Sequence, residues 1–216
     1  MLFDLGGVVF PSPFEAFDRY DERSGIPVGF TRSVVRVSSE SGAWAALERG
    51  ELSLGEFHAA LETEALAAGH PIDAAQMMAT IGEGGGARPA MLAAIERLRG
   101  AGLRVGALTN NWADAGLTSP EREDEVAPLD GPAGLVARDL FDTVVESSKV
   151  GLRKPDPRIY ELALARLGVT AEVTVFLDDL GINLKPARSM GMATIKVVDH
   201  VVALRELGAL LDLELV

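Results

Sequence analysis

The chain has 216 residues, of which 48% are hydrophobic and 24% charged, a balance that suits one α/β domain with a modest insert and excludes an intrinsically disordered chain. Its formal net charge of −12 argues against nucleic acid as a partner, because polyphosphate would be repelled. The absence of cysteine excludes disulfides, thiolate catalysis and cysteine-ligated metal sites.

The sequence shows no targeting or membrane segment. No basic leader precedes the first apolar run, and no apolar stretch approaches the roughly 18 residues of a membrane span. We therefore expect a cytoplasmic protein with no membrane partner. The pattern does not distinguish a monomer from a homodimer, so both states stay open.

The first predicted strand covers residues 2–5 and is followed by a long helical insert. Residues 11–88 contain only helix-like segments separated by turn residues, and they are too many for a single crossover. The glycine run at 82–86 is interpreted as the return hinge, since a phosphate loop would need a preceding strand and a following Gly-Lys-Ser/Thr. The predicted domains are a core of residues 1–10 and 89–216 and an inserted domain of residues 11–88.

After the insert, strands and helices alternate. Met91, Ile95 and Leu98 share one helical face, and an irregular stretch at 113–134 is predicted to be a surface loop. This alternation predicts a parallel sheet joined by right-handed crossovers. The later strands are predicted at residues 103–108, 143–145, 173–177 and 193–197.

Polar side chains follow four of these strands, and the ends of parallel strands meet at one crevice. Asp4 leaves the first strand toward Gly6 and Gly7, where its carboxylate would lie at the sheet edge. Thr109 and Asn110 follow the second strand and offer a hydroxyl and an amide to a ligand. Ordinary turn capping is the alternative explanation for each motif taken alone.

The other two motifs carry a cation and a pair of acids. Lys154 precedes Pro155, just before a helix predicted to start near Pro157, although a solvated loop lysine fits the same pattern. Asp178 and Asp179 follow a fully apolar run, where adjacent carboxylates are costly unless a cation neutralises them. Hard oxygen ligands favour Mg²⁺, and the alternative is an acidic start to the next helix.

Together and in this order, the four motifs resemble those of the haloacid dehalogenase superfamily. The resemblance covers nearly the whole chain and implies an α/β fold with a Rossmann-like parallel sheet core and a helical cap inserted after the first strand. The stretches VFLDDLGINLKPARSMGM and LTNNW are also similar to the N-terminal phosphatase domain of soluble epoxide hydrolases and to a related domain of acyl-CoA dehydrogenase-like proteins.

The resemblance implies a Mg²⁺-dependent phosphatase that acts on a small phosphorylated substrate. Asp4 would be the nucleophile and form an aspartyl-phosphate intermediate. Asp4 and Asp179 would ligate Mg²⁺ through their carboxylates, Asp178 through a water molecule and Gly6 through its backbone carbonyl.

Three further residues would bind the substrate. By the same resemblance, Thr109 and Asn110 would hold phosphoryl oxygens, and Lys154 would neutralise charge between Asp4 and the phosphate. A phosphate beside several carboxylates requires such cations, after which phosphoryl transfer depends on positioning and electrostatics.

Gly6 departs from the family pattern, in which a second Asp usually serves as general acid and base. Losing a general acid costs roughly 10²- to 10⁴-fold in rate. The enzyme could favour good leaving groups such as acyl or anomeric sugar phosphates, take its proton from a cap residue or water, or be vestigial.

Two rival functions stay open. Gly6 is consistent with a catalytically idle module that binds a phosphorylated ligand. A 2-haloacid dehalogenase would use Asp4 without a metal, but the Asp178–Asp179 pair argues for a metal and hence for phosphate. Outside the motifs, Trp112 is predicted to line the pocket mouth, and Trp44 to pack in the cap interior.

Overall fold

The computed structural model describes residues 1–112 and 140–216, so the surface loop predicted at 113–134 lies outside the described residues. Five parallel strands form one sheet in the order β3-β2-β1-β4-β5. The predicted α/β fold with a parallel sheet is confirmed. The strands are β1 (Leu2–Phe3), β2 (Gly106–Thr109), β3 (Thr143–Glu146), β4 (Val175–Asp178) and β5 (Ala193–Lys196).

Two predicted strands start too early in the sequence. The segment 103–105 was expected in β2, but the Leu103 amide donates to the Leu98 carbonyl of the preceding helix, so β2 begins at Gly106. Val173 was expected in β4, but it ends a 3₁₀ turn at Ala171–Val173. Leu103 packs against the core and Val173 is 72% exposed, so in neither case does apolar character mark a strand residue.

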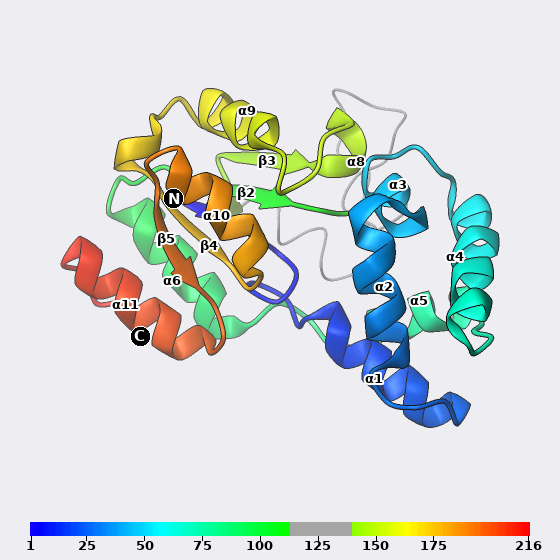
Figure 1. Cartoon of the computed structure of the whole chain (residues 1–216). Coiled ribbons are helices and arrows are strands. Elements are labelled where there is room, and N and C mark those ends of the chain that lie inside the picture. Colours follow the sequence, from blue (N-terminus) through cyan, green and yellow to red (C-terminus); the bar gives the residue numbers. More distant parts are fainter. Residues whose placement is uncertain (113–139) are drawn as a thin grey trace, which may run out of the picture.

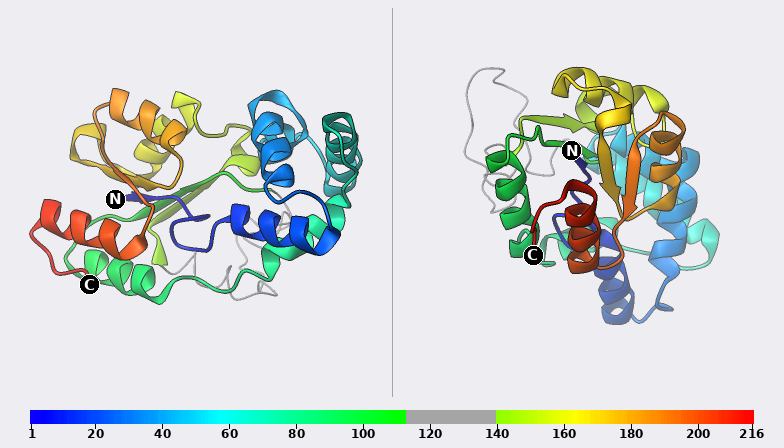
Figure 2. Two further views of the ribbon diagram at one scale, coloured as in Figure 1. Left: turned by 60° about the horizontal axis from the view of Figure 1, so that its bottom comes forward. Right: turned by 90° about the vertical axis from the view of Figure 1, so that its left-hand side faces the viewer.

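Helices cover both faces of the sheet (Figures 1 and 2). One face is covered by α6 (Pro89–Gly100) and α11 (His200–Leu211), and the other by α9 (Pro157–Leu167) and α10 (Gly181–Ser189). A short helix, α8 (Ser147–Val150), directly follows β3. The sheet is thus the middle of three layers, as expected for alternating strands and helices.

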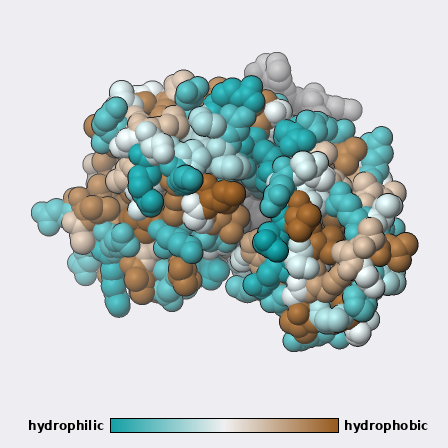
Figure 3. Space-filling model, in the orientation of Figure 1, coloured by the Kyte–Doolittle hydropathy of each residue, from teal (hydrophilic) through white to brown (hydrophobic). Residues whose placement is uncertain are grey.

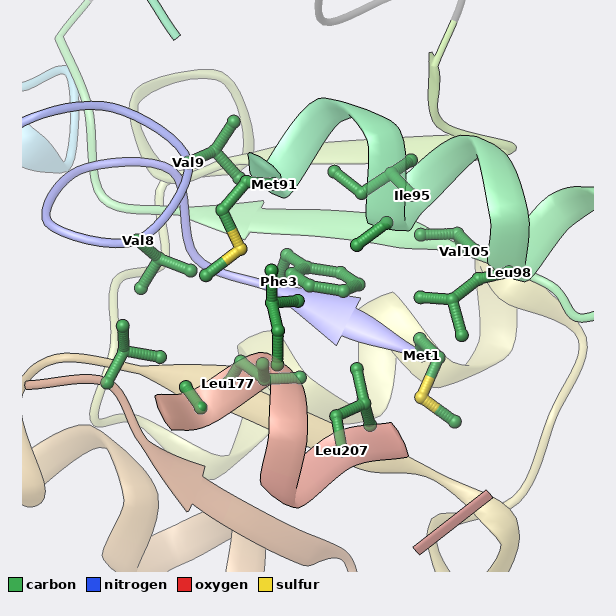
Figure 4. Packing of buried hydrophobic residues seen from close by; sticks show 14 of the residues in the cluster. Met1, Phe3, Val8, Val9, Met91, Ile95, Leu98, Val105, Leu177 and Leu207 are labelled. Atoms are coloured by element: carbon green, nitrogen blue, oxygen red, sulfur yellow. The ribbon is translucent and has the colours of Figure 1, made fainter. Parts of the chain in front are cut away.

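Successive side chains of the central strand β1 pack into the hydrophobic cores on opposite faces of the sheet. Phe3 belongs to the core under α6 and α11, whereas Leu2 belongs to the core under α9 and α10. Figure 4 shows the Phe3 ring among side chains of both covering helices and of β4, including Met91, Ile95 and Leu177. A strand of only two residues is therefore anchored from both faces.

Helices also form the whole insert between β1 and α6. Their shared interior is a third apolar cluster that contains Phe17, Trp44 and Phe57. The helical insert after the first strand is confirmed, whereas the exact domain limits at 11–88 and the hinge at 82–86 stay predictions. We call this unit, residues 13–82, the cap: α1 (Pro13–Ser24), α2 (Phe30–Ser41), α3 (Ala43–Glu48), α4 (Leu54–Ala68) and α5 (Ala74–Gly82).

The cap lies beyond the carboxyl ends of the strands (Figure 1). In the space-filling view an indentation separates the two parts (Figure 3). The residues that follow β1, β2 and β4 therefore lie where the two parts meet. Among the described helices, none is long and apolar enough to cross a membrane.

Candidate active site

Three carboxylates gather where β1 and β4 end. Asp4, Asp178 and Asp179 each offer an oxygen within 4.8 Å of the others. The Asp4 amide donates to the Leu177 carbonyl at 2.8 Å, which extends the β1–β4 pairing to the nucleophile position predicted from sequence. Parallel pairing therefore brings the first and fourth motifs together.

Lys154 joins two of these acids. Its Nζ lies 2.8 Å from Asp4 Oδ1 and 2.7 Å from Asp178 Oδ2, and its side chain is fully buried. The ammonium also lies 5.5 Å from the centre of the Phe176 ring. An ammonium that is buried in this way and shared by two carboxylates is held in one position.

The Asp178 carboxylate is fixed from its other side. Oδ1 accepts from the Leu180 amide at 2.8 Å, and Asn183 Nδ2 donates to both carboxylate oxygens at 3.1 Å. Asn183 is buried in the first turn of α10, and its role was not predicted. Its only sequence signal is its place one turn after the acid pair.

Burial and mutual repulsion shift the pKa values of these groups. Burial, and next the Asp178 carboxylate, raise the pKa of Asp179 to about 6. Burial also raises the pKa of Asp4, although Lys154 opposes the shift. For Lys154, burial alone would lower the pKa, but Asp178 and Asp4 outweigh it and the net shift is upward.

The charges of the cluster do not balance. When all three carboxylates are ionised, the one ammonium in contact with the cluster leaves two negative charges, which one divalent cation would balance. The donor set consists of oxygens alone, which suits Mg²⁺. The described residues therefore fit a magnesium site at this edge of the sheet.

The two glycines after Asp4 have different surroundings. Gly7 has a φ of +76°, and a Cβ there would lie 2.2 Å from Asp179 Oδ2, so no side chain fits. A Cβ on Gly6 would meet only Pro13 Cδ, at an ordinary 3.7 Å. The requirement for glycine at position 7 was not predicted, whereas Gly6 borders the cavity described below.

Asn110, which directly follows β2, makes hydrogen bonds with both the backbone amide and the backbone carbonyl of Lys154. Asn110 Oδ1 accepts from the Lys154 amide at 2.8 Å, and Nδ2 donates to the Lys154 carbonyl at 3.0 Å. Thr109 is 3% exposed, and its hydroxyl donates to the Asn110 carbonyl at 3.4 Å. Both residues thus lie beside the site, and their binding of phosphoryl oxygens stays a prediction.

A cavity of about 890 Å³ lies between the core and the cap. Its core wall includes the predicted residues Asp4, Gly6, Asn110, Lys154 and Asp179. Its cap wall combines apolar and aromatic residues with charged residues such as Arg32 and Arg36. That wall includes Phe14, Phe17, Val35 and Trp44.

Both tryptophans border this cavity. Trp112 lies 5.9 Å from Trp44 between ring centres, and both line the wall. The pocket position predicted for Trp112 is confirmed. Trp44 is 5% exposed and packs in the cap interior as predicted, but it also reaches the cavity.

Cap and core meet directly at two places near α3 and α8. Glu48, the last residue of α3, receives hydrogen bonds from Arg153 of the core, and neither residue was predicted at the site. Gly50 has a φ of +70°, and a Cβ there would lie 2.4 Å from the Ser148 carbonyl oxygen. A buried ion pair and a backbone contact therefore set the spacing of the two parts on this side.

Comparison with known proteins places this geometry in a family context. Residues 1–191 match the family model described as haloacid dehalogenase-like hydrolase. The chain is 36% identical over 218 residues to acyl-CoA dehydrogenase family member 10 of Mus musculus, covering 100% of this chain and 19% of that protein. It is 32% identical over 229 residues to bifunctional epoxide hydrolase 2 of Sus scrofa, covering 99% and 39%.

These two relatives are much longer than the chain, which spans about a fifth and about two fifths of their lengths. A relative of similar length is the sesquiterpene phosphatase of Aspergillus oryzae, 27% identical over 211 residues, covering 97% of this chain and 94% of that one.

Solved structures share the fold. A predicted HAD-like family hydrolase from Porphyromonas gingivalis superimposes with a TM-score of 0.65 at 21% identity, covering 99% and 97% of the two chains. An enzyme of the same family from Bacteroides thetaiotaomicron, in complex with magnesium and inorganic phosphate, gives 0.59 at 20% identity, covering 90% and 91%.

Proposed function

Because the chain belongs to the haloacid dehalogenase-like hydrolases, we propose that it is a Mg²⁺-dependent phosphatase with Asp4 as its nucleophile. The observation that carries the proposal is the cluster of three carboxylates, two of them buried against Lys154, whose ionised form needs the charge of one divalent cation. Similarity to a sesquiterpene phosphatase supports phosphate as the group that is transferred.

In this proposal Mg²⁺ is held by the carboxylates of Asp4 and Asp179 and the backbone carbonyl of Gly6, with Asp178 acting through a water molecule. Bound there, the cation would neutralise charge on the phosphoryl oxygens. Support comes from the close approach of the three acids and from a structural neighbour in complex with magnesium and phosphate.

The chain's own residues carry the reaction in two steps. First, an Asp4 carboxylate oxygen attacks phosphorus, the bond from phosphorus to the leaving-group oxygen breaks, and that oxygen takes a proton from water. Water then attacks the phosphorus of the aspartyl phosphate, which releases inorganic phosphate and restores the carboxylate. Lys154 keeps its ammonium at the Asp4 carboxylate, which attacks in the first step and leaves in the second, while Thr109 and Asn110 bind phosphoryl oxygens.

The cavity supports a substrate with an apolar body. Aromatic residues line its cap side, and the half-exposed Leu180 and the exposed Ile182 line its core side. Its volume of about 890 Å³ lies within the usual range for small-molecule pockets, roughly 300–1,000 Å³. We propose a phosphate monoester of an apolar alcohol as the substrate class.

The missing general acid at Gly6 is consistent with one alternative function. A module that binds a phosphorylated ligand without hydrolysing it would share the fold and the acid cluster. Tight binding without release of phosphate, in a screen of phosphorylated metabolites with Mg²⁺, would favour that function. A metal-independent dehalogenase would instead stay active in the presence of a chelator.

The decisive variant is Asp4→Asn. We expect it to abolish Mg²⁺-dependent release of phosphate from 4-nitrophenyl phosphate and from a phosphate ester of a branched aliphatic alcohol. Asp212→Asn makes the same chemical change far from the site, at a helix end where asparagine tolerates the φ of 53°, and should leave the activity unchanged. Wild-type turnover in the Asp4 variant would refute the nucleophile assignment.

A further inference from the structure

Glu48 carries a buried carboxylate that the proposed mechanism does not use. It ends α3 in the cap, is 7% exposed and borders the cavity. Its Oε2 accepts from Arg153 Nε at 2.7 Å and from Arg153 Nη2 at 2.6 Å, and its Oε1 accepts from Trp44 Nε1 at 2.9 Å. Asn110 Nδ2 lies 3.4 Å from Oε2.

These contacts converge on the backbone of Lys154. Arg153 precedes Lys154 in the chain, and the Asn110 amide binds the Lys154 backbone on both sides of the residue. Arg153 Nη1 also donates to the Ser39 carbonyl of α2 at 2.5 Å. One cap carboxylate therefore binds both groups that flank the lysine.

The contacts suit an acceptor and not a proton donor. Every neighbouring group that approaches Glu48 is a donor, so its ionised form satisfies them all. Burial raises the pKa of Glu48, and the Arg153 guanidinium opposes that shift. A buried ion pair contributes little net stability, because desolvation offsets its Coulomb energy, so stability alone gives no reason for this pair.

We infer that Glu48 is a positioning residue, which holds Arg153 and Asn110 so that Lys154 stays between Asp4 and Asp178. The inference rests on the proposed function, because it assigns Lys154 a part in phosphoryl transfer. It also makes the cap part of the reaction site and not only a cover over the substrate.

The test is Glu48→Gln, which keeps the shape of the side chain and removes its charge. We expect kcat for 4-nitrophenyl phosphate with Mg²⁺ to fall about 10- to 100-fold, a size typical of groups that orient a reactive residue, with a smaller change in KM. Affinity for inorganic phosphate in the presence of Mg²⁺, measured by calorimetry, should fall about tenfold. In a crystal structure of the variant, Lys154 Nζ should have left at least one of its two carboxylates.

The matched control is Asp21→Asn. Asp21 is another fully buried cap carboxylate, and it accepts from the Gly29 amide at 2.8 Å and from Thr31, away from Lys154. Like Glu48→Gln, this variant removes a buried charge and should lower the melting temperature. Unlike Glu48→Gln, it should keep kcat and phosphate affinity within about twofold of wild type. Rates are compared at a temperature at which both variants are fully folded.

A double variant measures the coupling. Glu48→Gln combined with Arg153→Gln should lose no more activity than the larger single loss, because both changes break the same contact. Unchanged kcat and phosphate affinity in Glu48→Gln, with both Lys154 contacts intact in its structure, would overturn the inference. If the Glu48 inference fails in this way but Asp4→Asn abolishes turnover, the proposed phosphatase function still holds. Persistent turnover in Asp4→Asn would refute both the proposed function and the inference about Glu48.

Discussion

At the scale of single residues, two positions close to Asp4 carry no side chain. Gly7 leaves room for the Asp179 carboxylate, and Gly6 leaves an open position beside Asp4. One glycine is required by space and by its positive φ, whereas the other is not. The two positions therefore respond differently to the same substitution.

Alanine substitutions test this difference. Gly7→Ala should lower Mg²⁺ affinity about 10- to 100-fold, because the new methyl group displaces a proposed ligand. Gly6→Ala should leave Mg²⁺ affinity within about twofold, since its methyl group makes only an ordinary contact. Titration calorimetry with Mg²⁺ measures both. Equal affinities in the two variants would show that Asp179 does not bind the cation.

Gly6→Asp tests whether the chain lacks a general acid. The cavity has room for the new side chain, so we expect a folded protein with faster turnover of alkyl phosphates, by up to roughly 10²- to 10⁴-fold. Acyl phosphates should gain less, because their leaving groups need no proton. Steady-state kinetics on one substrate of each kind compares them, and equal gains would remove the leaving-group argument.

Sequence patterns predicted the residues of the site that follow strands. Asp4, Lys154 and the acid pair 178–179 stand next to apolar runs or a proline, and parallel pairing then brings them together. Glu48 and Arg153 carry no such signal, since their meeting depends on how the cap docks. Long-range packing of that kind is not encoded in local spacing.

At the scale of elements, the site is built on very short strands. β1 has two residues and is paired on both sides, with β2 and β4. Its position depends on Phe3, which is fully buried against α6 and α11. The proposed nucleophile therefore follows directly after a residue that anchors the sheet.

Phe3→Ala should reduce the free energy of unfolding by about 3–5 kcal/mol, through lost burial and the cavity left behind. Leu66→Ala, on the 64%-exposed face of α4, should change it by less than about 0.5 kcal/mol. Urea denaturation followed by circular dichroism measures both. A small loss for Phe3→Ala would mean that β1 is anchored by its backbone alone.

Element type was easier to predict than element limits. Each predicted strand overlaps an observed strand, because apolar runs and helical periods mark sheet and helix over several residues. The starts of β2 and β4 were wrong, because Leu103 is apolar where it packs on the core and Val173 is apolar although it is exposed in a 3₁₀ turn. The end of the first strand was also wrong, since β1 stops at Phe3 and not at Leu5. Boundaries follow from hydrogen bonding, which the hydrophobic pattern does not show.

At the scale of the whole molecule, negative charge predominates both in the chain and at the candidate site. The chain carries a net charge of −12, and it includes a cluster of three carboxylates in which one lysine, Lys154, makes direct ion pairs. Folding without a cation must therefore oppose the repulsion among these acids. The protein's stability is thus expected to depend on divalent ions.

Mg²⁺ at about one hundred times its Kd should stabilise the fold by about 2.7 kcal/mol, which for a chain of this size raises Tm by roughly 5–10 °C. EDTA should reverse the rise, and sodium chloride at equal ionic strength should not reproduce it. Asp179→Asn should abolish the Mg²⁺-dependent part. Differential scanning calorimetry measures Tm, and an unchanged shift in that variant would place the cation elsewhere.

Gly50 is a point of close approach between the cap and the core. A Cβ there would lie 2.4 Å from the Ser148 carbonyl oxygen, so a larger residue must move the cap and Ser148 apart on that side. Glycine at position 50 thus allows the closest approach of cap and core that any residue there would permit. Successively larger residues at position 50 would widen this gap and would also pull on the neighbouring Glu48–Arg153 contact, so the depth of the cavity and the position of Lys154 would change together.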